Sequence, residues 1–240
     1  LFGMVAELER QDGPDVMNLS FEERIGLLAN AQIHDMEQRK FNRLFKSAKL
    51  KIPSACIEDI DYKASRGLDK GYLKSLSNCD WIKQGQHLVF TGKTGVGKTW
   101  LACAYAQQAL RKGIPALFYR FSLLLEDLDI ARKDGSLPRL RKKLSRAKVL
   151  IIDDWAMSPL NARYRQDILE LVEERSGSDA FIFTSQLPID KWHDYINEPA
   201  YADAIMDRIV HRAHTFELCG ERSMRELHAD TVKKMMANRG

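Results

Sequence analysis

The sequence lacks the features that mark secreted, membrane-spanning or zinc-binding proteins. Its four cysteines are scattered and contain no C-x-x-C pair, which argues against both a zinc site and a disulfide framework. It contains no long uncharged apolar run, so we expect neither a signal peptide nor a membrane span. We therefore expect a cytoplasmic protein with reduced cysteines. The first residue is Leu1 rather than methionine, which leaves open a natural N-terminus further upstream.

Acidic residues are absent between Gln38 and Ile57, where basic residues are frequent. Three of these basic residues fall at helical spacing, which predicts a basic helix face suited to the phosphate backbone of a nucleic acid. A merely solvated helix face is the alternative, because charge runs are common on surfaces. The candidate DNA contacts of this first basic patch are Arg39, Lys40, Arg43, Lys46 and Lys49.

A second basic patch is expected on two helices, one from Ser122 to Lys133 and one from Leu137 to about Arg146. Between Arg132 and Lys148, Asp134 is the single acid among many basic residues. A helix that only connects two strands needs no such charge, so we predict contact with nucleic acid, again with a solvated face as the alternative. The candidate contacts here are Arg139, Lys142 and Lys143.

The phosphate-binding pattern G-x-x-x-x-G-K-[ST] is met at every fixed position of residues 92–99. Its glycines accept unusual dihedrals, Lys98 can reach the β and γ phosphates, and Thr99 offers a hydroxyl to Mg²⁺. A buried strand is expected before it at residues 87–91, and a helix after it, to Leu110, as the motif requires. The candidate ATP-binding residues are Gly92, Lys93, Thr94, Gly95, Val96, Gly97, Lys98, Thr99 and Trp100.

The segment Val149–Asp154 predicts a buried strand whose end carries two carboxylates. Asp153 is the candidate Mg²⁺ ligand, acting through water in the manner of a Walker B acid. Asp154 is the candidate residue that orients or deprotonates the attacking water. The alternative is that both carboxylates only cap the turn that follows.

Two further strands are expected, at residues 114–120 and 180–186, with a helix from Asn161 to Arg175 before the second. Gln186 ends the latter strand, so its amide could contact the γ-phosphate or the attacking water, with Ser185 as a lesser candidate. A polar exit into the following turn is the alternative.

The N-terminal region predicts two or three helices. One lies around Val5–Arg10, one is opened by Asn18-Leu19-Ser20, and the basic segment completes the set. The pattern breaks near Pro53, where we place the boundary between a helical domain (1–53) and an α/β domain (54–240).

Five segments together resemble one family. They are residues 92–99, 149–154, Thr184–Pro188, Asp203–Arg208 and Gly220–Arg225. They resemble the IstB-type ATP-binding proteins of insertion sequences, relatives of the DnaC-type helicase loaders among the AAA+ ATPases. The resemblance covers roughly residues 57–225 well and the N-terminal helices more loosely.

The resemblance implies an α/β AAA+ P-loop core with a five-stranded parallel sheet, its last strand at His214–Leu218, and a small all-helical N-terminal DNA-binding domain. It also implies an ATP-dependent homo-oligomer that assembles on and remodels double-stranded DNA and recruits the transposase of the same insertion sequence. Arg208 would be an arginine finger acting on ATP held by a neighbouring subunit. Pairing with Asp203 or Asp207 is the alternative. Arg225 is a candidate phosphate contact.

Two other functions are kept open. A helicase loader of the DnaC type would act on a replicative helicase and bind single-stranded DNA. A phosphotransferase would need lid arginines and an acceptor pocket, for which the sequence offers no convincing candidates.

Overall fold

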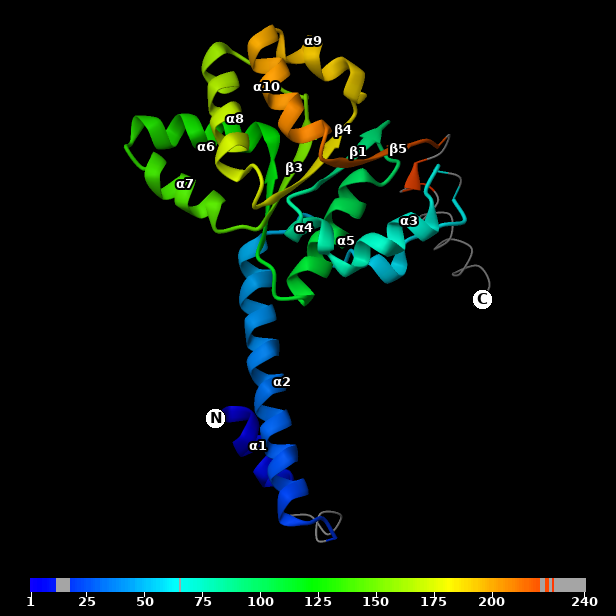
Figure 1. The fold of residues 1–240 in the computed structure, drawn as a ribbon, viewed down its shortest axis with the longest axis vertical. Helices are drawn as coiled ribbons and strands as arrows, with labels where there is room; N and C mark the ends of the chain where they lie inside the picture. Colours follow the sequence, from blue (N-terminus) through cyan, green and yellow to red (C-terminus); the bar gives the residue numbers. More distant parts are fainter. Residues whose placement is uncertain (12–17, 65, 221–222, 225, 227–240) are drawn as a thin grey trace, which may run out of the picture.

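Five parallel strands lie at the centre of the molecule, with helices on both faces of the sheet (Figure 1). The computed structural model describes residues 1–11, 18–64, 66–220, 223, 224 and 226. The strand order is β2-β3-β4-β1-β5, and every neighbouring pair is parallel. The expectation of an α/β P-loop fold with a five-stranded parallel sheet is confirmed. The strands are β1 (His87–Gly92), β2 (Ala116–Arg120), β3 (Val149–Trp155), β4 (Ala180–Ser185) and β5 (Ala213–Leu218).

The helices of the described residues divide into an N-terminal pair, a short connector set and a core set. The N-terminal pair is α1 (Phe2–Arg10) and α2 (Phe21–Ala48). The connector contains η2 (Ile57–Asp59), α3 (Lys70–Ser75), η3 (Leu76–Asn78) and α4 (Asp80–Lys83). The core contains α5 (Lys98–Arg111), α6 (Phe121–Lys133), α7 (Leu137–Ser145), α8 (Ala162–Arg175), η4 (Ile189–Lys191), α9 (Trp192–Ile196) and α10 (Pro199–Val210).

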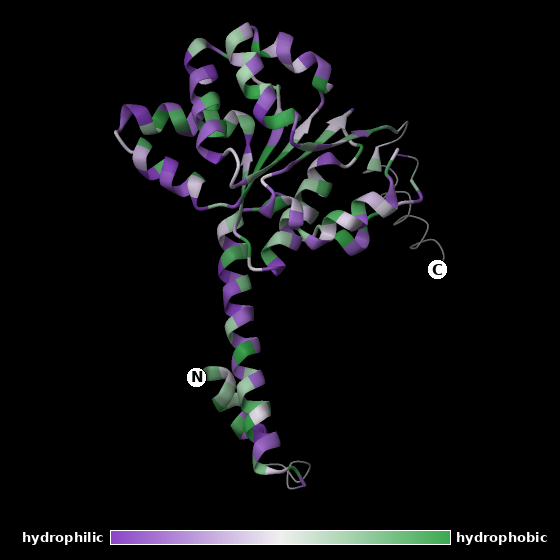
Figure 2. Ribbon diagram, in the orientation of Figure 1, coloured by the Kyte–Doolittle hydropathy of each residue, from purple (hydrophilic) through white to green (hydrophobic). Residues whose placement is uncertain are grey.

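Alternation along the strands builds two separate apolar layers. In β1, Leu88 and Phe90 pack into the cluster that includes α5, whereas Val89 packs into the cluster that includes α6 and α8. Ile151 and Ile152 in β3 divide in the same way. Strands buried on both faces must be apolar at nearly every position, and Figure 2 shows the central strands in the apolar colour. This burial fixes the carboxyl ends of the strands, where the candidate site lies.

The N-terminal pair forms a helical arm that extends away from the core (Figure 1). A capping box fixes the start of α2, since the Ser20 hydroxyl accepts a hydrogen bond from Glu23 N–H and the Glu23 carboxylate accepts one from Ser20 N–H. The basic segment is not a separate helix but the C-terminal half of α2, because nothing in residues 21–48 interrupts the helix. The expectation of two or three helices therefore resolves to two among the described residues.

The last turns of α2 belong to the core rather than to the free arm. Ala48 is fully buried, and Phe41, Leu44 and Phe45 pack against the same apolar cluster as α5. The helix ends at Lys49, whose φ of 52° is left-handed. The arm and the core thus meet before the boundary proposed at Pro53.

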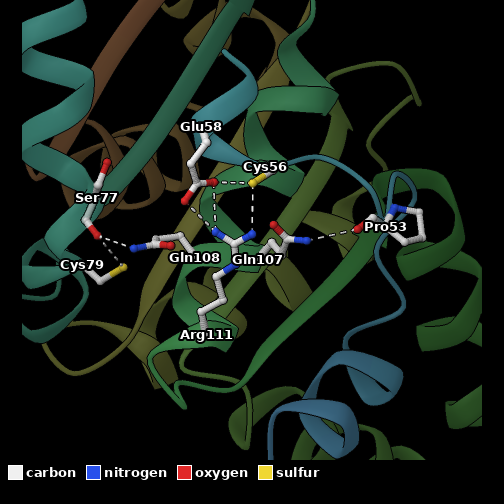
Figure 3. Close-up of polar contacts among 8 residues, drawn as sticks. All are labelled: Pro53, Cys56, Glu58, Ser77, Cys79, Gln107, Gln108 and Arg111. Atoms are coloured by element: carbon white, nitrogen blue, oxygen red, sulfur yellow. Dashed lines mark hydrogen bonds and ion pairs between the residues drawn. The ribbon is translucent and has the colours of Figure 1, made fainter. Parts of the chain in front are cut away.

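The connector after the arm is fastened to α5, the helix that follows the phosphate-binding loop (Figure 3). Arg111 forms an ion pair with Glu58 at 2.8 Å, and Gln107 donates a hydrogen bond to the Pro53 carbonyl at 3.3 Å. Hydrogen bonds from the Cys56 thiol and from Arg111 lower the pKa of Glu58 to about 2. The connector therefore has a fixed path beside the phosphate-binding loop.

The expectation that the chain has no membrane span can be compared with the helices of the structure. None of the helices in the part of the chain that the structure describes is long and apolar enough to cross a bilayer.

Candidate nucleotide-binding site

The loop between β1 and α5 needs its glycines for geometric reasons. Gly92, Gly95 and Gly97 have φ values of 133°, 90° and 99°, which side chains rarely allow. A Cβ atom at Gly92 would lie 2.2 Å from the carbonyl oxygen of Leu218 in β5, so a side chain there would collide with backbone. The loop ends at the N-terminus of α5, a 14-residue helix whose first N–H groups and dipole favour an anion.

Lys98 begins α5 and turns its side chain back into the loop. Its ammonium donates hydrogen bonds to the carbonyls of Gly92 at 2.7 Å and Lys93 at 2.8 Å. Burial lowers the pKa of Lys98, while Asp154 and Asp153 act in the opposite direction. The loop thus holds a buried positive charge at its centre, 7% exposed as a residue.

Two segments distant in sequence brace the loop. Arg66, 4% exposed, donates to the carbonyl of Val96 at 3.2 Å and to that of Asp61 at 2.6 Å. Met224 donates its N–H to the carbonyl of Gly95 at 2.9 Å. Arg66 was not identified from the sequence, because its role depends on the path of the connector.

Asp153, at the end of β3, is fully buried and collects three donors. Its Oδ1 accepts hydrogen bonds from the hydroxyls of Thr99 and Thr184, each at 2.7 Å. Its Oδ2 accepts one from the ammonium of Lys51 at 2.9 Å. The structure therefore joins the two predicted Mg²⁺ residues, Thr99 and Asp153, and adds two partners that the sequence did not indicate.

The backbone at Asp154 departs from the extended conformation of β3, so the regular alternation of side chains between the two faces of the sheet is interrupted there. Its φ is 60°, and the pairing register with β4 shifts between Ile152 and Trp155. Its N–H donates to Thr184 Oγ1 at 3.1 Å, and its carboxylate forms an ion pair with Arg120 of β2 at 3.2 Å. With 23% of its side chain exposed, Asp154 can meet both a guanidinium and water.

The polar end of β4 divides into structural and available side chains. The Ser185 hydroxyl donates to the carbonyl of Trp155 at 3.0 Å and accepts from Leu187 N–H, so it fixes the turn. Gln186, directly after the strand, is exposed. Of Ser185 and Gln186, Gln186 is therefore the side chain left available.

Trp100, the last of the candidate ATP-binding residues, lies in the first turn of α5 and is partly buried against the core cluster.

Arg208 lies in α10 and is engaged within its own subunit. It donates to the carbonyl of Ala204 at 2.8 Å and forms an ion pair with Glu173 of α8 at 2.9 Å. The alternative, an ion pair of Arg208 with Asp203 or Asp207, is wrong, because the guanidinium pairs with Glu173 of α8 instead. The Arg208 side chain keeps 31% exposure.

The first basic patch lies along α2, and all five of its candidate residues are exposed. Arg39 pairs with Asp35 at 2.9 Å, and its guanidinium lies 4.4 Å from the centroid of the Phe2 ring. Lys40 lies beside the turn at Gly113, near the base of the arm. Arg43, Lys46 and Lys49 continue the exposed positive charge to the end of the helix.

The second basic patch, on α7, is partly neutralised by its surroundings. Lys143 donates to the Tyr119 hydroxyl at 2.6 Å and lies over that ring. Arg141 pairs with two acids of α8, Glu170 and Glu174. Arg139 and Lys142 are exposed and remain available for a polyanion.

The residues present suit an ATP–Mg²⁺ ligand. A carboxylate and a hydroxyl are the oxygen ligands that Mg²⁺ prefers, and Thr99 and Asp153 lie at hydrogen-bonding distance beside the phosphate-binding loop. The loop itself offers backbone N–H groups, a helix N-terminus and Lys98. Arg225, the candidate phosphate contact, lies outside the described residues together with Glu221 and Arg222.

Comparison with known proteins gives a consistent result. The sequence profile of a family described as IstB-like ATP binding protein matches residues 3–231. A Sinorhizobium fredii protein named as an insertion-sequence ATP-binding protein is 43% identical over 203 residues, 85% of this chain and 82% of its own length. A similarly named Pseudomonas fluorescens protein is 46% identical over 189 residues, 78% of this chain and 82% of its own.

Solved structures share the fold at lower identity. DnaI superposes with a TM-score of 0.59 at 21% identity, covering 69% of this chain and 92% of its own. The helicase loader DnaC superposes with a TM-score of 0.55 at 18% identity, covering 69% and 97%. DnaA from Aquifex aeolicus, bound to AMPPCP, reaches 0.56 at 13% identity, covering 78% and 56%. The core therefore has the AAA+ fold.

Proposed function

Because this chain belongs to the family of IstB-like ATP binding proteins, we propose that it is an Mg²⁺-dependent ATPase that assembles on double-stranded DNA and serves transposition. The observation that carries the proposal is the hydrogen bond between Thr99 of the phosphate-binding loop and the buried Asp153. It joins the loop that follows β1 to the end of β3, two strands that lie on either side of β4, and the carboxyl ends of strands are where ligands bind in open α/β sheets.

The residues of the loop bind the polyphosphate. Lys98 exchanges its bonds to the carbonyls of Gly92 and Lys93 for bonds to phosphate oxygens, which are stronger because both partners are charged. Thr99 and Asp153 would hold Mg²⁺, which would supply charge neutralisation to the phosphates. Burial of Asp153 excludes water from the back of the site.

Hydrolysis requires a group that orients the attacking water. Asp154 takes this role, with Thr184 fixing its backbone and Arg120 paired with its carboxylate. Gln186, exposed directly after β4, would contact the same water or the γ-phosphate. Arg208 of a neighbouring subunit completes the site by stabilising charge in the transition state, which makes hydrolysis depend on assembly.

DNA is held through the basic arm and by the exposed part of the second patch. Arg43, Lys46 and Lys49 form a continuous positive run on α2, and Arg139 and Lys142 add charge on α7. Contacts of this kind bind the phosphate backbone with little base specificity. The assembled complex remodels the duplex and recruits the transposase of the same insertion sequence.

The test is the mass of the protein in solution by light scattering, with ATP–Mg²⁺ or ADP, and with or without duplex DNA of several tens of base pairs. A large assembly that requires both ATP and duplex supports the proposal. A particle that stays monomeric under every condition contradicts it.

A second candidate function is helicase loading, and the fold shared with the helicase loader DnaC favours it. A loader of this type would respond to single-stranded DNA and to a replicative helicase. Repeating the mass measurement with single strands of the same length separates the two functions. Only a helicase loader is expected to assemble on single-stranded DNA in preference to duplex DNA.

A further inference from the structure

The carboxylate of Asp153 forms an ion pair with Lys51, which lies where the arm joins the core. Lys51 Nζ lies 2.9 Å from Asp153 Oδ2, although the two residues are 102 positions apart in the chain. In the part of the chain that the structure describes, Lys51 supplies the one cationic nitrogen within ion-pair distance of Asp153. A fully buried carboxylate needs such compensation, because burying an unpaired charge is costly.

The backbone on either side of Lys51 is held in place, whereas its side chain is partly exposed. Its neighbour Leu50 is buried, and Lys51 follows the left-handed end of α2 at Lys49 by two residues. Further along, the Pro53 carbonyl is held by Gln107 of α5 (Figure 3). The Lys51 side chain is 46% exposed, so its ammonium can move from Asp153 into water.

A divalent cation at Thr99 and Asp153 would meet the Lys51 ammonium at the same carboxylate. Two cations at one small site repel, and the repulsion is strong where water is excluded. Release of Lys51 into solvent avoids it. The opposite holds without the metal, when Lys51 supplies the charge that Asp153 lacks.

We propose that Lys51 is a resident cation of the metal site, which neutralises Asp153 in the absence of Mg²⁺ and is displaced when Mg²⁺–nucleotide binds. This inference rests on the proposed function. Metal binding and the Lys51–Asp153 pair then oppose each other, and by linkage the metal loosens the linker of residues 49–53, where the arm joins the core.

The first test measures metal affinity directly. Free Mn²⁺ is followed by electron paramagnetic resonance during titration into protein saturated with ADP, for the wild type and for Lys51→Met. The variant keeps the length of the side chain and loses the charge. We expect it to bind Mn²⁺ at least about fivefold more tightly, while Lys51→Arg stays close to the wild type.

A matched control is available in Lys148→Met. Lys148 is also half exposed, at 51%, and pairs at 2.6 Å with a buried carboxylate, that of Asp179. This control should leave Mn²⁺ affinity unchanged. Equal Mn²⁺ affinity in the wild type and Lys51→Met overturns the inference and leaves the proposed function intact. A wild-type protein that does not bind ADP contradicts the proposed function instead.

A second measurement needs no variant and stands even if Lys51→Met does not fold. Hydrogen exchange of the wild type is compared with ATP plus Mg²⁺ and with ATP plus a chelator. The Ala55 amide donates to the Ile52 carbonyl at 3.2 Å and reports on the linker. Faster exchange in residues 50–56 with Mg²⁺ supports displacement of Lys51, and unchanged or slower exchange there contradicts it.

Discussion

Arg120 and Asp154 form an ion pair across two neighbouring strands, with 3.2 Å between Arg120 Nε and Asp154 Oδ2. Arg120 is the last residue of β2 and Asp154 lies near the end of β3. A carboxylate drawn toward a guanidinium is less available to accept a hydrogen bond from an attacking water. The pair therefore favours a resting state of the site.

Substitution Arg120→Ala should raise the ATPase rate in the absence of DNA. A partly exposed pair of this kind contributes about 0.5–1 kcal/mol, which corresponds to a rise of about twofold to fivefold. The rate is measured by phosphate release, with Lys83→Ala as control, since Lys83 forms an exposed ion pair with Asp80 away from the site. A fall in rate would mean that Arg120 holds Asp154 in its productive position instead.

Binding and hydrolysis should separate between two substitutions in the site. Lys98→Ala removes charge-assisted bonds to phosphate and should weaken nucleotide affinity by at least about tenfold. Asp154→Asn keeps the size of the side chain but not its charge, so nucleotide affinity should stay within about twofold while turnover falls about a hundredfold. A fluorescent nucleotide measures the first quantity and phosphate release the second. Wild-type turnover in Asp154→Asn would remove the water-orienting role from this residue.

The basic face of α2 should contribute to DNA binding through salt-dependent contacts. Neutralising Arg39, Arg43 and Lys46 together should reduce the slope of log affinity against log salt by about 2.7, at about 0.9 for each phosphate contact. Fluorescence anisotropy with a labelled duplex at several salt concentrations measures it. A control variant neutralises three exposed lysines of the connector, Lys63, Lys74 and Lys83. An unchanged slope in the arm variant would leave α2 with a merely solvated face.

The sequence was sufficient to predict the parts of the site that depend on local pattern. The phosphate-binding loop and four of the strands follow from glycine spacing and apolar runs, whereas the last strand and the parallel five-stranded sheet were implied by the family resemblance. The structure confirms these elements. The boundaries differ by a few residues at most, as in β2, which begins at Ala116 instead of the expected Ile114. Helix and strand ends depend on competing local contacts.

The partners of the two carboxylates could not be predicted, because they depend on strand order and on a backbone irregularity. Arg120 meets Asp154 only because β2 lies beside β3, and Thr184 meets Asp153 only because β4 lies on the other side. The left-handed φ of Asp154 has no glycine to announce it in the sequence. Lys51 reaches the site through the path of the connector, which carries no periodic pattern.

Stability should depend on pH through His87, the first residue of β1. Its Nδ1 accepts a hydrogen bond from Phe181 N–H at 3.1 Å, so the proton resides on Nε2, which donates to the Arg208 carbonyl at 3.1 Å. Burial lowers the pKa of His87 from 6.5 to about 4. His87 therefore stays neutral in the folded state between pH 6.5 and about 4, whereas it takes up a proton in the unfolded state. This difference favours unfolding as the pH falls below 6.5.

The contribution of His87 is complete above pH 6.5 and is lost as the pH falls toward 4. The difference corresponds to about 3 kcal/mol of unfolding free energy. Urea unfolding at pH 7.5, 5.5 and 4.5 measures it, and His87→Gln should flatten part of the decline, whereas a substitution of the exposed His34 to glutamine should not. An identical decline in His87→Gln would assign the pH dependence to other groups.

Arg208 provides the sharpest test of assembly, because in the isolated chain its guanidinium is paired with Glu173. If it acts on a neighbouring subunit, Arg208→Ala should bind ATP but lose DNA-stimulated hydrolysis, by about a thousandfold, the lower end of such effects. Arg212→Ala, one turn beyond and exposed, is the control. Mixing is more decisive than either variant alone. Lys98→Ala subunits bind ATP weakly but keep Arg208, whereas Arg208→Ala subunits bind ATP but lack the arginine.

Mixed assemblies of the two variants should therefore hydrolyse ATP faster than either variant alone, since a Lys98→Ala subunit supplies Arg208 to the ATP of its Arg208→Ala neighbour. Phosphate release at several mixing ratios, with DNA present, should pass through a maximum at intermediate ratios. A rate that is only the weighted sum of the two variants would place Arg208 in its own subunit, where the bond to Glu173 gives it a structural role.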